Sequence, residues 1–417
     1  MMPAMRYSLI FTILVCTLAL AAHAQSWEPN AQLVQEMQKR RPERMIDESK
    51  VPAYRLPDAL RMSDGRRIAS AGQWPDRRDE ILELFRREMF GRTPGRPDEL
   101  RFELIEEDLR ALDGTATRRR ISIQSSHEGR SHQFELKLFL PNEPKDPVPA
   151  FLLICNRDPE LNIDHTRKNR SEFWPVEEII ARGYGMVAFF NGQLAPDKSE
   201  QFREGVLKLF EGDSKDRPAD AWAALAAWAW GASRAMDYLE TDPRVDAKRV
   251  AVAGHSRGGK TALWAAAEDQ RFALAISNNS GSCGAALSRR RYGETIAMTD
   301  GNPHWFADNF RKYNDREDDL PFDQHMLIGL LAPRAVYVTS ATEDLWADPR
   351  GEFLGLAHSS SVYALWNHPP IPLDAMPPAD TPMIFGPRAY HIRTGKHNLT
   401  LYDWLRFADF ADRLWPR

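Results

Sequence analysis

One stretch decides the fold of this chain: residues 250–264, VAVAGHSRGGKTALW. Its first part is a short apolar run that predicts a strand, and its second part, from Gly259, predicts a helix. Between them, residues 254–258 match the pattern G-x-S-x-G. When this pattern follows a strand and opens a helix, it forms a sharp corner that lifts the serine hydroxyl above the sheet. The context favours Ser256 as a nucleophile over an ordinary turn serine.

Short apolar runs alternate with helical patterns on both sides of this corner. The runs are typical of strands buried on both faces, and they fall at 148–156, 183–191, 249–256, 272–281 and 334–344. The helical patterns fall at 174–183, 220–242, 259–270 and 322–331. Three earlier segments with alternating polarity predict antiparallel strands, at 100–109, 117–126 and 132–141. We therefore expect an α/β fold of three layers, with a mostly parallel central sheet and antiparallel N-terminal strands.

The first 24 residues predict a cleavable export signal. Arg6 precedes the apolar run 9–22, and two alanines at 22 and 24 supply small residues before Gln25. A retained membrane anchor is the alternative, although the run is short for a bilayer span. No later segment reaches spanning length, so we expect a secreted or periplasmic protein that is free of the membrane after signal removal.

The rest of the chain divides into two parts that differ in composition and sequence pattern. Residues 25–98 are rich in Arg, Pro and Glu and contain one amphipathic helical pattern, at 76–91. We expect an N-terminal helical extension over 25–98, packed on a catalytic domain over 99–417. No internal repeat or low-complexity linker separates them.

Composition excludes several kinds of partner. The chain has 417 residues, of which 43% are apolar and 27% are charged, with a net charge of −4. Aromatic residues are not interleaved with a sustained basic stripe, so we expect no nucleic-acid partner. The sequence has no H-E-x-x-H motif and no cluster of metal-ligating residues, so we expect no metal and no cofactor. The expected assembly is a monomer, and whether Cys155 pairs with Cys283 stays open.

A serine nucleophile needs a base, and in this architecture the chain order is serine, acid, histidine. His397 lies in a turn just before the final helical pattern, where a loop imidazole can reach the serine. His391 lies inside the last apparent strand, RAYHIR, where packing is its simpler role. His397 is therefore the preferred base.

The orienting acid should follow a strand that ends near the serine. Asp344 closes the run 334–344 and lies in the loop immediately after the strand that this run predicts. Asp348 precedes Pro349 at the approach to a helix, where capping is its ordinary role. Glu343 is a weaker competitor, so Asp344 is the preferred acid.

Four blocks around these residues resemble the glucuronoyl esterases, carbohydrate esterase family 15. They are GHSRGGK (254–260), NNSGSCGAALSRRRYGE (278–294), EDLWADPRGEF (343–353) and GKHNLTLYDW (395–404). The resemblance covers most of the chain from about residue 100 onward, and it implies an α/β-hydrolase fold. It also implies hydrolysis of esters that join 4-O-methyl-glucuronate groups of xylan to lignin alcohols. The expected partner is a glucuronoxylan or lignin–carbohydrate ester.

The resemblance also implies roles for individual residues. Ser256 would be the nucleophile and His397 the base, while Arg257 would stabilise the oxyanion through its backbone N–H and its guanidinium. Lys260, Glu294 and Trp346 would hold the sugar ring.

The residue types fit these roles, and each has a structural alternative. Lys260 lies one helical turn after Ser256 and could donate to sugar hydroxyls, or it could be a solvated helix lysine. Arg257 could instead be an ion-pair partner, and Glu294 could neutralise the three preceding arginines. Trp346 could be a core aromatic.

One position departs from the family pattern. Many relatives carry a glutamate directly before Ser-Gly in the second block, and this chain has Asn279 there. An amide cannot stabilise an imidazolium by charge, so either Asp344 supplies the charge or the triad is broken. Two alternatives to a glucuronoyl esterase therefore stay open. One is an acetyl-xylan or other carbohydrate esterase, and the other is a catalytically impaired carbohydrate-binding relative.

Overall fold

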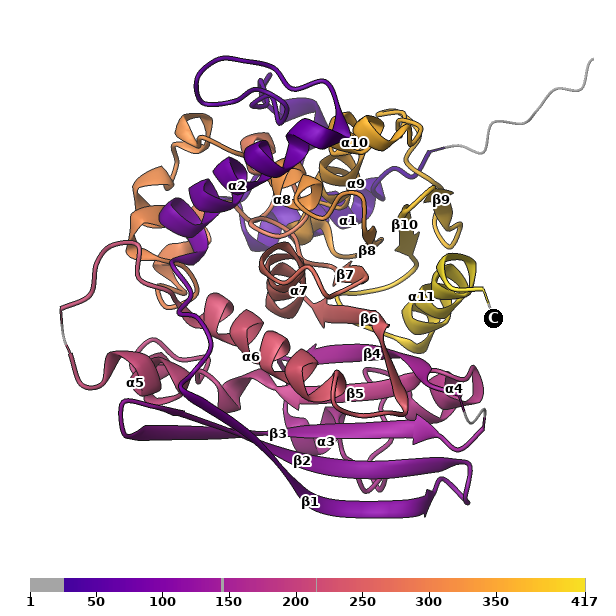
Figure 1. Ribbon diagram of the computed structural model, residues 1–417. Helices are drawn as coiled ribbons and strands as arrows, with labels where there is room; N and C mark the ends of the chain where they lie inside the picture. Colours follow the sequence, from indigo (N-terminus) through magenta and orange to yellow (C-terminus); the bar gives the residue numbers. More distant parts are fainter. Residues whose placement is uncertain (1–25, 144–145, 215, 417) are drawn as a thin grey trace, which may run out of the picture.

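The described chain is built around one ten-stranded mixed sheet (Figure 1). The computed structural model describes residues 26–143, 146–214 and 216–416, so the expected export signal at 1–24 lies outside the described residues. The strands are β1 Glu99–Ala111, β2 Ala116–His127, β3 Arg130–Pro141, β4 Val148–Cys155, β5 Gly185–Phe190, β6 Val245–His255, β7 Leu274–Asn278, β8 Ala335–Ala341, β9 Met383–Phe385 and β10 Arg388–Arg393.

The strand order is β1-β2-β3-β5-β4-β6-β7-β8-β10-β9. Parallel pairing joins β5, β4, β6, β7, β8 and β10, while β1, β2 and β3 form an antiparallel edge. The predicted mostly parallel sheet with antiparallel N-terminal strands is confirmed. The short strand β9, which pairs antiparallel with β10, was not predicted.

Helices cover both faces of the sheet. One face carries α4 Val176–Ala181 and α11 Leu401–Leu414, and the other carries α2 Trp74–Phe85, α6 Ala224–Leu239, α7 Arg257–Glu268, α8 Gln324–Gly329 and α9 Pro349–His358. Alternate residues of β4 show the two layers. Leu153 packs in one buried cluster with Trp404 of α11, and Leu152 packs in the other with Trp264 of α7. This alternation explains why the parallel strands read as continuous apolar runs.

The predicted helices are present with shifted ends. The pattern at 76–91 is α2, which ends at Phe85 and continues as a π-helical turn, Arg86–Phe90. The chain then turns at Gly91 with φ 87°, where a Cβ atom would lie 2.3 Å from Ala221 O. The remaining α-helices of the described residues are α1 Ala31–Arg40, α3 Pro159–Asn162, α5 Val206–Glu211 and α10 Ser360–Tyr363.

The segment before β1 is joined to the rest by packing. Ile81 and Phe85 of α2 share one buried cluster with Trp264 of α7. The division at residue 98 into an extension and a catalytic domain stays a prediction.

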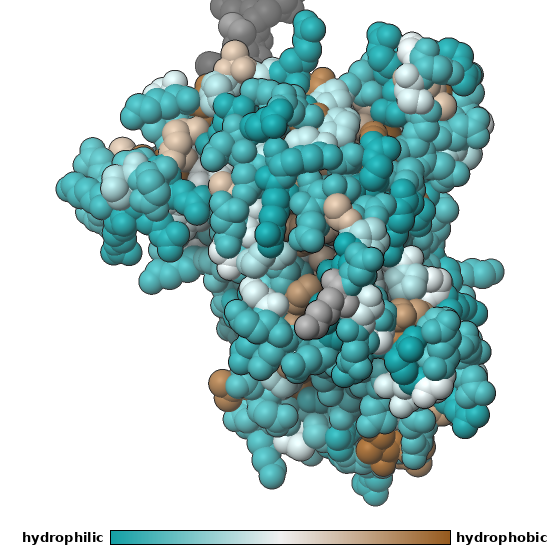
Figure 2. Space-filling model, turned by 90° about the vertical axis from the view of Figure 1, so that its left-hand side faces the viewer, coloured by the Kyte–Doolittle hydropathy of each residue, from teal (hydrophilic) through white to brown (hydrophobic). Residues whose placement is uncertain are grey.

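Figure 2 shows a face that is largely hydrophilic, with apolar side chains in small groups. No helix among the described residues is long and apolar enough to cross a membrane.

Cys155 and Cys283 are both buried free thiols, so they do not pair with each other.

Candidate active site

Ser256 occupies the corner between β6 and α7, with φ 57° and ψ −125°. Positive φ in a non-glycine residue is strained and recurs at functional sites. A Cβ atom at Gly254 would lie 2.0 Å from Gly258 O, so glycine lets the strand and the helix approach this closely. The Ser256 N–H donates to Asn278 O at 2.9 Å, which ties the corner to the end of β7. The predicted strand–corner–helix unit is therefore present.

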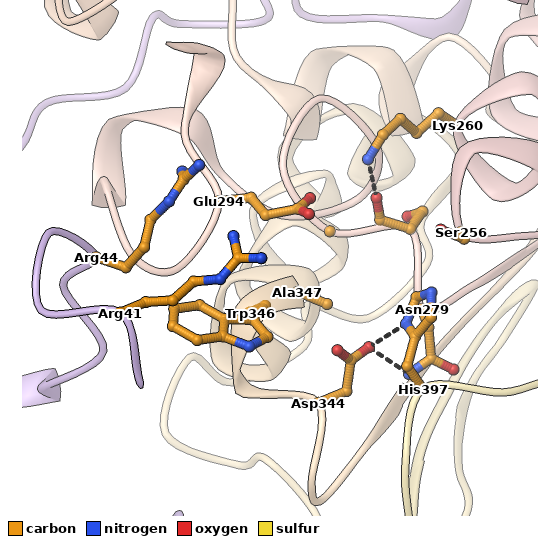
Figure 3. Close-up of a pocket in the computed structure, with 12 residues that line it drawn as sticks. Arg41, Arg44, Ser256, Lys260, Asn279, Glu294, Asp344, Trp346, Ala347 and His397 are labelled. Carbon is orange, nitrogen blue, oxygen red and sulfur yellow. Dashed lines mark hydrogen bonds and ion pairs between the residues drawn. The ribbon is translucent and has the colours of Figure 1, made fainter. Parts of the chain in front are cut away.

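His397 and Asp344 face the same pocket as Ser256 (Figure 3). Asp344 follows β8, is 6% exposed, and its Oδ2 lies 2.6 Å from His397 Nδ1. A carboxylate on Nδ1 orients the ring and leaves Nε2 to act as the base. Asn279 Nδ2 donates to the same Oδ2 at 3.1 Å. Among the contacts of the described residues, no hydrogen bond joins His397 to Ser256.

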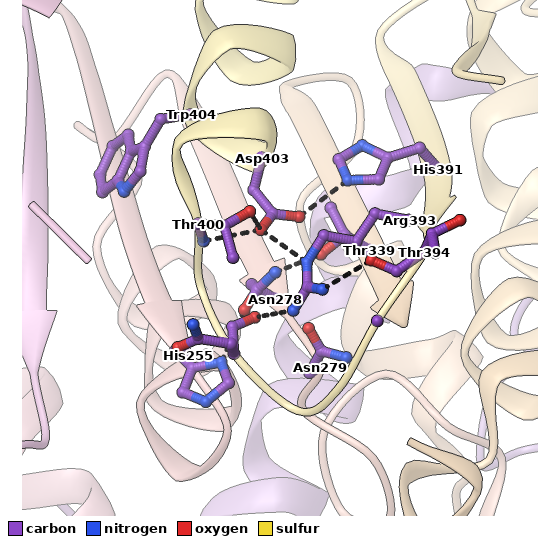
Figure 4. Close-up of polar contacts among 12 residues, drawn as sticks. His255, Asn278, Asn279, Thr339, His391, Arg393, Thr394, Thr400, Asp403 and Trp404 are labelled. Carbon is purple, nitrogen blue, oxygen red and sulfur yellow. Dashed lines mark hydrogen bonds and ion pairs between the residues drawn. The ribbon is translucent and has the colours of Figure 1, made fainter. Parts of the chain in front are cut away.

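The competing histidine lies in a different environment. His391 is fully buried in β10, with Nδ1 3.0 Å from the Tyr337 hydroxyl and Nε2 2.9 Å from Asp403 Oδ1 (Figure 4). Both ring nitrogens are thus engaged in the interior. The structure gives His391 the packing role that its place in a strand suggested.

Among the described contacts, neither competing acid pairs with the His397 ring. Asp348 accepts a hydrogen bond from Gly351 N–H at 2.9 Å at the start of α9, and it pairs with Arg290 at 2.8 Å. It is therefore a helix cap, as its sequence context suggested. Glu343 is exposed and does not line the pocket.

The pocket at the corner has a volume of about 260 Å³. Its walls come from the loops after α1, β6, β7, β8 and β10, which meet at the carboxyl ends of the parallel strands, where ligands of such sheets bind. The lining residues are Arg41, Arg44, Ser256, Lys260, Asn279, Ser280, Gly281, Glu294, Asp344, Trp346, Ala347 and His397. Of the seven residues expected from the sequence, only Arg257 is not among them.

Lys260 is not a solvated helix lysine. It is 2% exposed, and its Nζ donates to Ser282 O at 2.7 Å and to Ser280 O. An ammonium group has three N–H donors. Two of them bond to the loop after β7, the third has no acceptor among the described residues, and Lys260 lines the pocket.

Glu294 and Trp346 form the opposite wall. Gly293, with φ 64°, brings the two together, because a Cβ atom there would lie 2.4 Å from Trp346 O. The Glu294 N–H donates to Trp346 O at 2.9 Å. Within the described ranges, the three arginines at 289–291 pair with carboxylates other than Glu294. The alternative that Glu294 neutralises them is therefore wrong.

Arg257 begins α7 directly after Ser256. Its guanidinium pairs with Asp197, and its Nη2 donates to Asn156 O at 3.0 Å. Asp197 also accepts from Trp305 Nε1 at 2.7 Å. The ion pair left open by the sequence is therefore present. The oxyanion role of Arg257 stays a prediction.

Two charged residues of the pocket lining were not predicted from the sequence. Arg41 and Arg44 reach the pocket from the turn after α1, and the Arg41 guanidinium carbon lies 5.6 Å from the centre of the Trp346 ring. They lie in an arginine-rich stretch with no distinguishing pattern, so nothing local marks them. Within the described chain, no group of three or more His, Cys, Asp or Glu residues is arranged to hold a metal.

A buried carboxyl group supports the loop after β7. Glu352 of α9 is 0% exposed, accepts from Gly281 N–H at 2.9 Å, and lies 2.6 Å from Ser340 Oγ. Burial, together with the charge of Asp344, raises the pKa of Glu352 to about 8. At neutral pH Glu352 is mostly protonated and adds little negative charge beside Asp344.

This raised pKa links stability to pH. The folded chain holds a proton on Glu352 that the unfolded chain releases above the ordinary pKa of 4.5, so stability declines as pH rises from about 5 to about 8. We expect Glu352→Gln to flatten that decline by roughly 2–4 kcal/mol in the free energy of unfolding. Urea denaturation at pH 5 and pH 8 measures it, with Glu343→Gln as the exposed control. Equal slopes in Glu352→Gln and wild type would contradict the assignment.

The fold and the pocket define an α/β-hydrolase. A family model described as "Glucuronyl esterase, fungi" matches residues 123–366. The chain belongs to the glucuronoyl esterase family and is a carboxylic ester hydrolase.

Relatives of known name and structure support this assignment. Carbohydrate esterase MZ0003, from an unknown prokaryotic organism, is 42% identical over 395 residues, covering 88% of this chain and 91% of the relative. The 4-O-methyl-glucuronoyl methylesterase of Schizophyllum commune is 29% identical over 74% of this chain and 72% of its own. The solved glucuronoyl esterase of Solibacter usitatus superposes with a TM-score of 0.82 at 42% identity, over 88% of this chain and 100% of that one.

Proposed function

We propose that this chain hydrolyses esters of glucuronic or 4-O-methyl-glucuronic acid, such as those linking glucuronoxylan to lignin alcohols. The observation that carries the proposal is the composition of one small pocket. Ser256 and a His397–Asp344 pair lie at one end, and charged and aromatic side chains line the other (Figure 3). An acetyl ester would make no use of that second end, whereas a hydroxylated sugar acid would fill it.

The proposed reaction passes through an acyl-enzyme. His397 Nε2 takes the proton of the Ser256 hydroxyl as Oγ attacks the ester carbonyl carbon. The oxyanion is stabilised by N–H groups at the start of α7 and by Arg257, because the first N–H groups of a helix lack partners within it. The C–O bond to the alcohol then breaks, and the alcohol leaves with the proton from His397. Water, deprotonated by His397, attacks the acyl carbon, and glucuronate is released as Ser256 regains its proton.

Asp344 carries the charge that this cycle needs. The His397 imidazolium forms twice per turnover, and a buried carboxylate at 2.6 Å stabilises it each time. Asn279 supports this role, because its amide N–H donates to the same carboxylate oxygen. The triad is thus proposed to be complete, with the acid after β8 rather than after β7.

The sugar would lie between Lys260 and the Glu294–Trp346 wall. The free N–H of Lys260 and the Glu294 carboxylate suit sugar hydroxyls, and the Trp346 ring offers a flat face to the sugar. Export by the signal at 1–24, solubility after its removal and a monomeric state belong to the same proposal.

Turnover of paired substrates tests the proposal. Methyl and benzyl esters of glucuronate are compared with acetylated xylan and 4-nitrophenyl acetate, with Ser256→Ala as the blank. The proposal expects the glucuronate esters to have the highest kcat/KM. Faster turnover of acetylated xylan would favour the other carbohydrate esterase. That outcome has some support, because a solved relative from a marine bacterial metagenome, with 40% identity and a TM-score of 0.79, is described as a promiscuous esterase.

A further inference from the structure

Arg157 lies just after β4, between the serine corner and the histidine loop. Its Nη2 lies 3.1 Å from His255 Nε2, and its Nη1 donates to Asn398 Oδ1 at 2.7 Å. His255 is the residue before Ser256, and Asn398 is the residue after His397. One guanidinium therefore spans the chain neighbours of both groups that must meet during the reaction.

The donor pattern fixes the direction of this network. Arginine can only donate, so His255 Nε2 accepts and the ring proton lies on Nδ1. His255 Nδ1 then donates to Asn278 Oδ1 at 2.6 Å, and Asn278 Nδ2 donates to Thr339 Oγ1 at 2.6 Å. Burial, with the charges of His397 and Arg157, holds the pKa of His255 well below its usual range. A neutral His255 packs with its ring centre 4.4 Å from that of His397 and does not repel the imidazolium.

The other hydrogen bonds of the histidine loop hold it to the end of β8 and to β10, not to the corner at Ser256. The Gly395 N–H donates to Thr342 Oγ1 at 3.1 Å, and His397 Nδ1 lies 2.6 Å from Asp344 Oδ2. Arg393, buried in β10, donates to Lys396 O at 2.6 Å and to Asn398 O at 2.8 Å, and it pairs with Asp403 (Figure 4). These contacts shape the loop around His397. They do not connect it to the corner at Ser256.

We infer that Arg157 is a positioning residue that sets the separation of Ser256 and His397. The Phe173 ring, 4.5 Å from the guanidinium carbon and 2% exposed, keeps Arg157 in place. We call the contacts of Arg157 with His255 and Asn398 the Arg157 clamp. Small errors in the geometry of reacting groups lower the rate by large factors, so the clamp should act on the chemical step rather than on substrate binding.

Replacement of Arg157 by glutamine tests the clamp. We expect kcat for 4-nitrophenyl acetate and the rate of Ser256 labelling by a fluorophosphonate to fall about 10–100-fold, with KM nearly unchanged. Arg157→Lys should recover part of the loss, because an ammonium group can reach one of the two acceptors. Arg167→Gln is the matched control, since that arginine pairs with Glu177 at 2.7 Å and has no part in the network.

A second variant keeps the test independent of folding. Asn398→Ala removes only one arm of the clamp from a partly exposed loop, and the double variant with Arg157→Gln should lose no more than Arg157→Gln alone. Additive losses, or a labelling rate equal to wild type in a folded Arg157→Gln protein, would overturn the inference.

A separate observation concerns the far end of the pocket, and it rests on the proposed function. The turn with Arg41 and Arg44 is anchored behind the Glu294–Trp346 wall, because Gly293 N–H donates to Met45 O at 2.7 Å and Ile46 is 0% exposed. Among the described residues, no carboxylate forms an ion pair with either arginine. Figure 3 shows the Arg41 guanidinium between Trp346 and Glu294.

The geometry points to a site for a free carboxylate on the substrate saccharide. The ester end of the sugar lies at Ser256, so the opposite end meets the part of the saccharide beyond the esterified glucuronate. Guanidinium groups bind carboxylates through paired charge-assisted hydrogen bonds. A second, unesterified uronate on the same saccharide is the group that this end of the pocket would recognise.

An oligosaccharide with one methyl-esterified and one free glucuronate tests this site against methyl glucuronate alone. For Arg41→Gln/Arg44→Gln, we expect KM for the oligosaccharide to rise about tenfold or more, and by a clearly larger factor than KM for the monomer. Salt at about 0.5 M should raise the wild-type KM in the same direction. Arg40→Gln, an exposed neighbour outside the pocket, is the control.

The outcomes separate this inference from the proposed function. Equal KM values of wild type and the double variant on the oligosaccharide would overturn the carboxylate site. Failure of wild type on both saccharide esters, with turnover of 4-nitrophenyl acetate, would overturn the proposed function, and the carboxylate site with it.

Discussion

Asp344→Asn is expected to lower kcat for methyl glucuronate by about 10⁴-fold, the loss typical of a triad acid. The amide keeps the size of the side chain but supplies no negative charge to the His397 imidazolium. It can also turn its carbonyl or its NH₂ toward Nδ1, so the tautomer is no longer fixed. Steady-state turnover at saturating substrate measures the effect. A kcat within tenfold of wild type would contradict the assignment of the acid.

A second substitution, at the end of β7, returns a negative charge to the site of the Asp344→Asn variant. Asn279 lies 3.1 Å from the Asp344 carboxylate, so both positions face His397 from neighbouring strand ends. Asn279→Glu in the Asp344→Asn background should recover about 10–100-fold in kcat, since carboxylate charge returns to the site. Asn279→Gln in that background is the matched control and should recover nothing.

His397→Gln is expected to have a larger effect, about 10⁵–10⁶-fold on kcat, because both acylation and deacylation lose their proton carrier. His391→Gln provides the contrast. His391 is fully buried against Asp403 and Tyr337, so its replacement should lower the melting temperature while the folded enzyme keeps most of its turnover. A large loss of kcat in folded His391→Gln, with activity retained in His397→Gln, would reverse the two roles.

Local patterns predicted the strand–corner–helix unit at Ser256 and the chain order of the proposed triad, which is serine, acid, histidine. The G-x-S-x-G match, two-face burial of the parallel strands and the placement of Asp344 directly after β8 all follow from short stretches of sequence. His397 could be distinguished from His391 because a side chain in a buried strand packs in the interior, whereas a side chain in a turn can extend toward the serine. These features depend on periodicity and on strand ends, which a single sequence displays.

Contacts between distant segments were not predictable in the same way. Arg157 bridges residues about 100 and 240 positions away, and the pocket receives Arg41 from a segment that precedes the sheet. Lys260 was expected to touch a ligand, but no pattern showed that two of its donors hold the loop at 280–282. Such roles depend on tertiary packing, and arginine-rich stretches look alike whether they are solvated or line a pocket.

The proposed chemistry depends above all on acylation of Ser256 by glucuronate esters, with help from the His397–Asp344 pair. A decisive measurement treats the protein with a fluorophosphonate, maps the modified residue by peptide mass spectrometry, and follows methyl glucuronate hydrolysis in the same samples. We predict one modification, on Ser256, with activity lost in proportion to its occupancy. Full hydrolysis by protein modified at Ser256 would refute this chemistry, as would failure of Ser256 to react in folded protein.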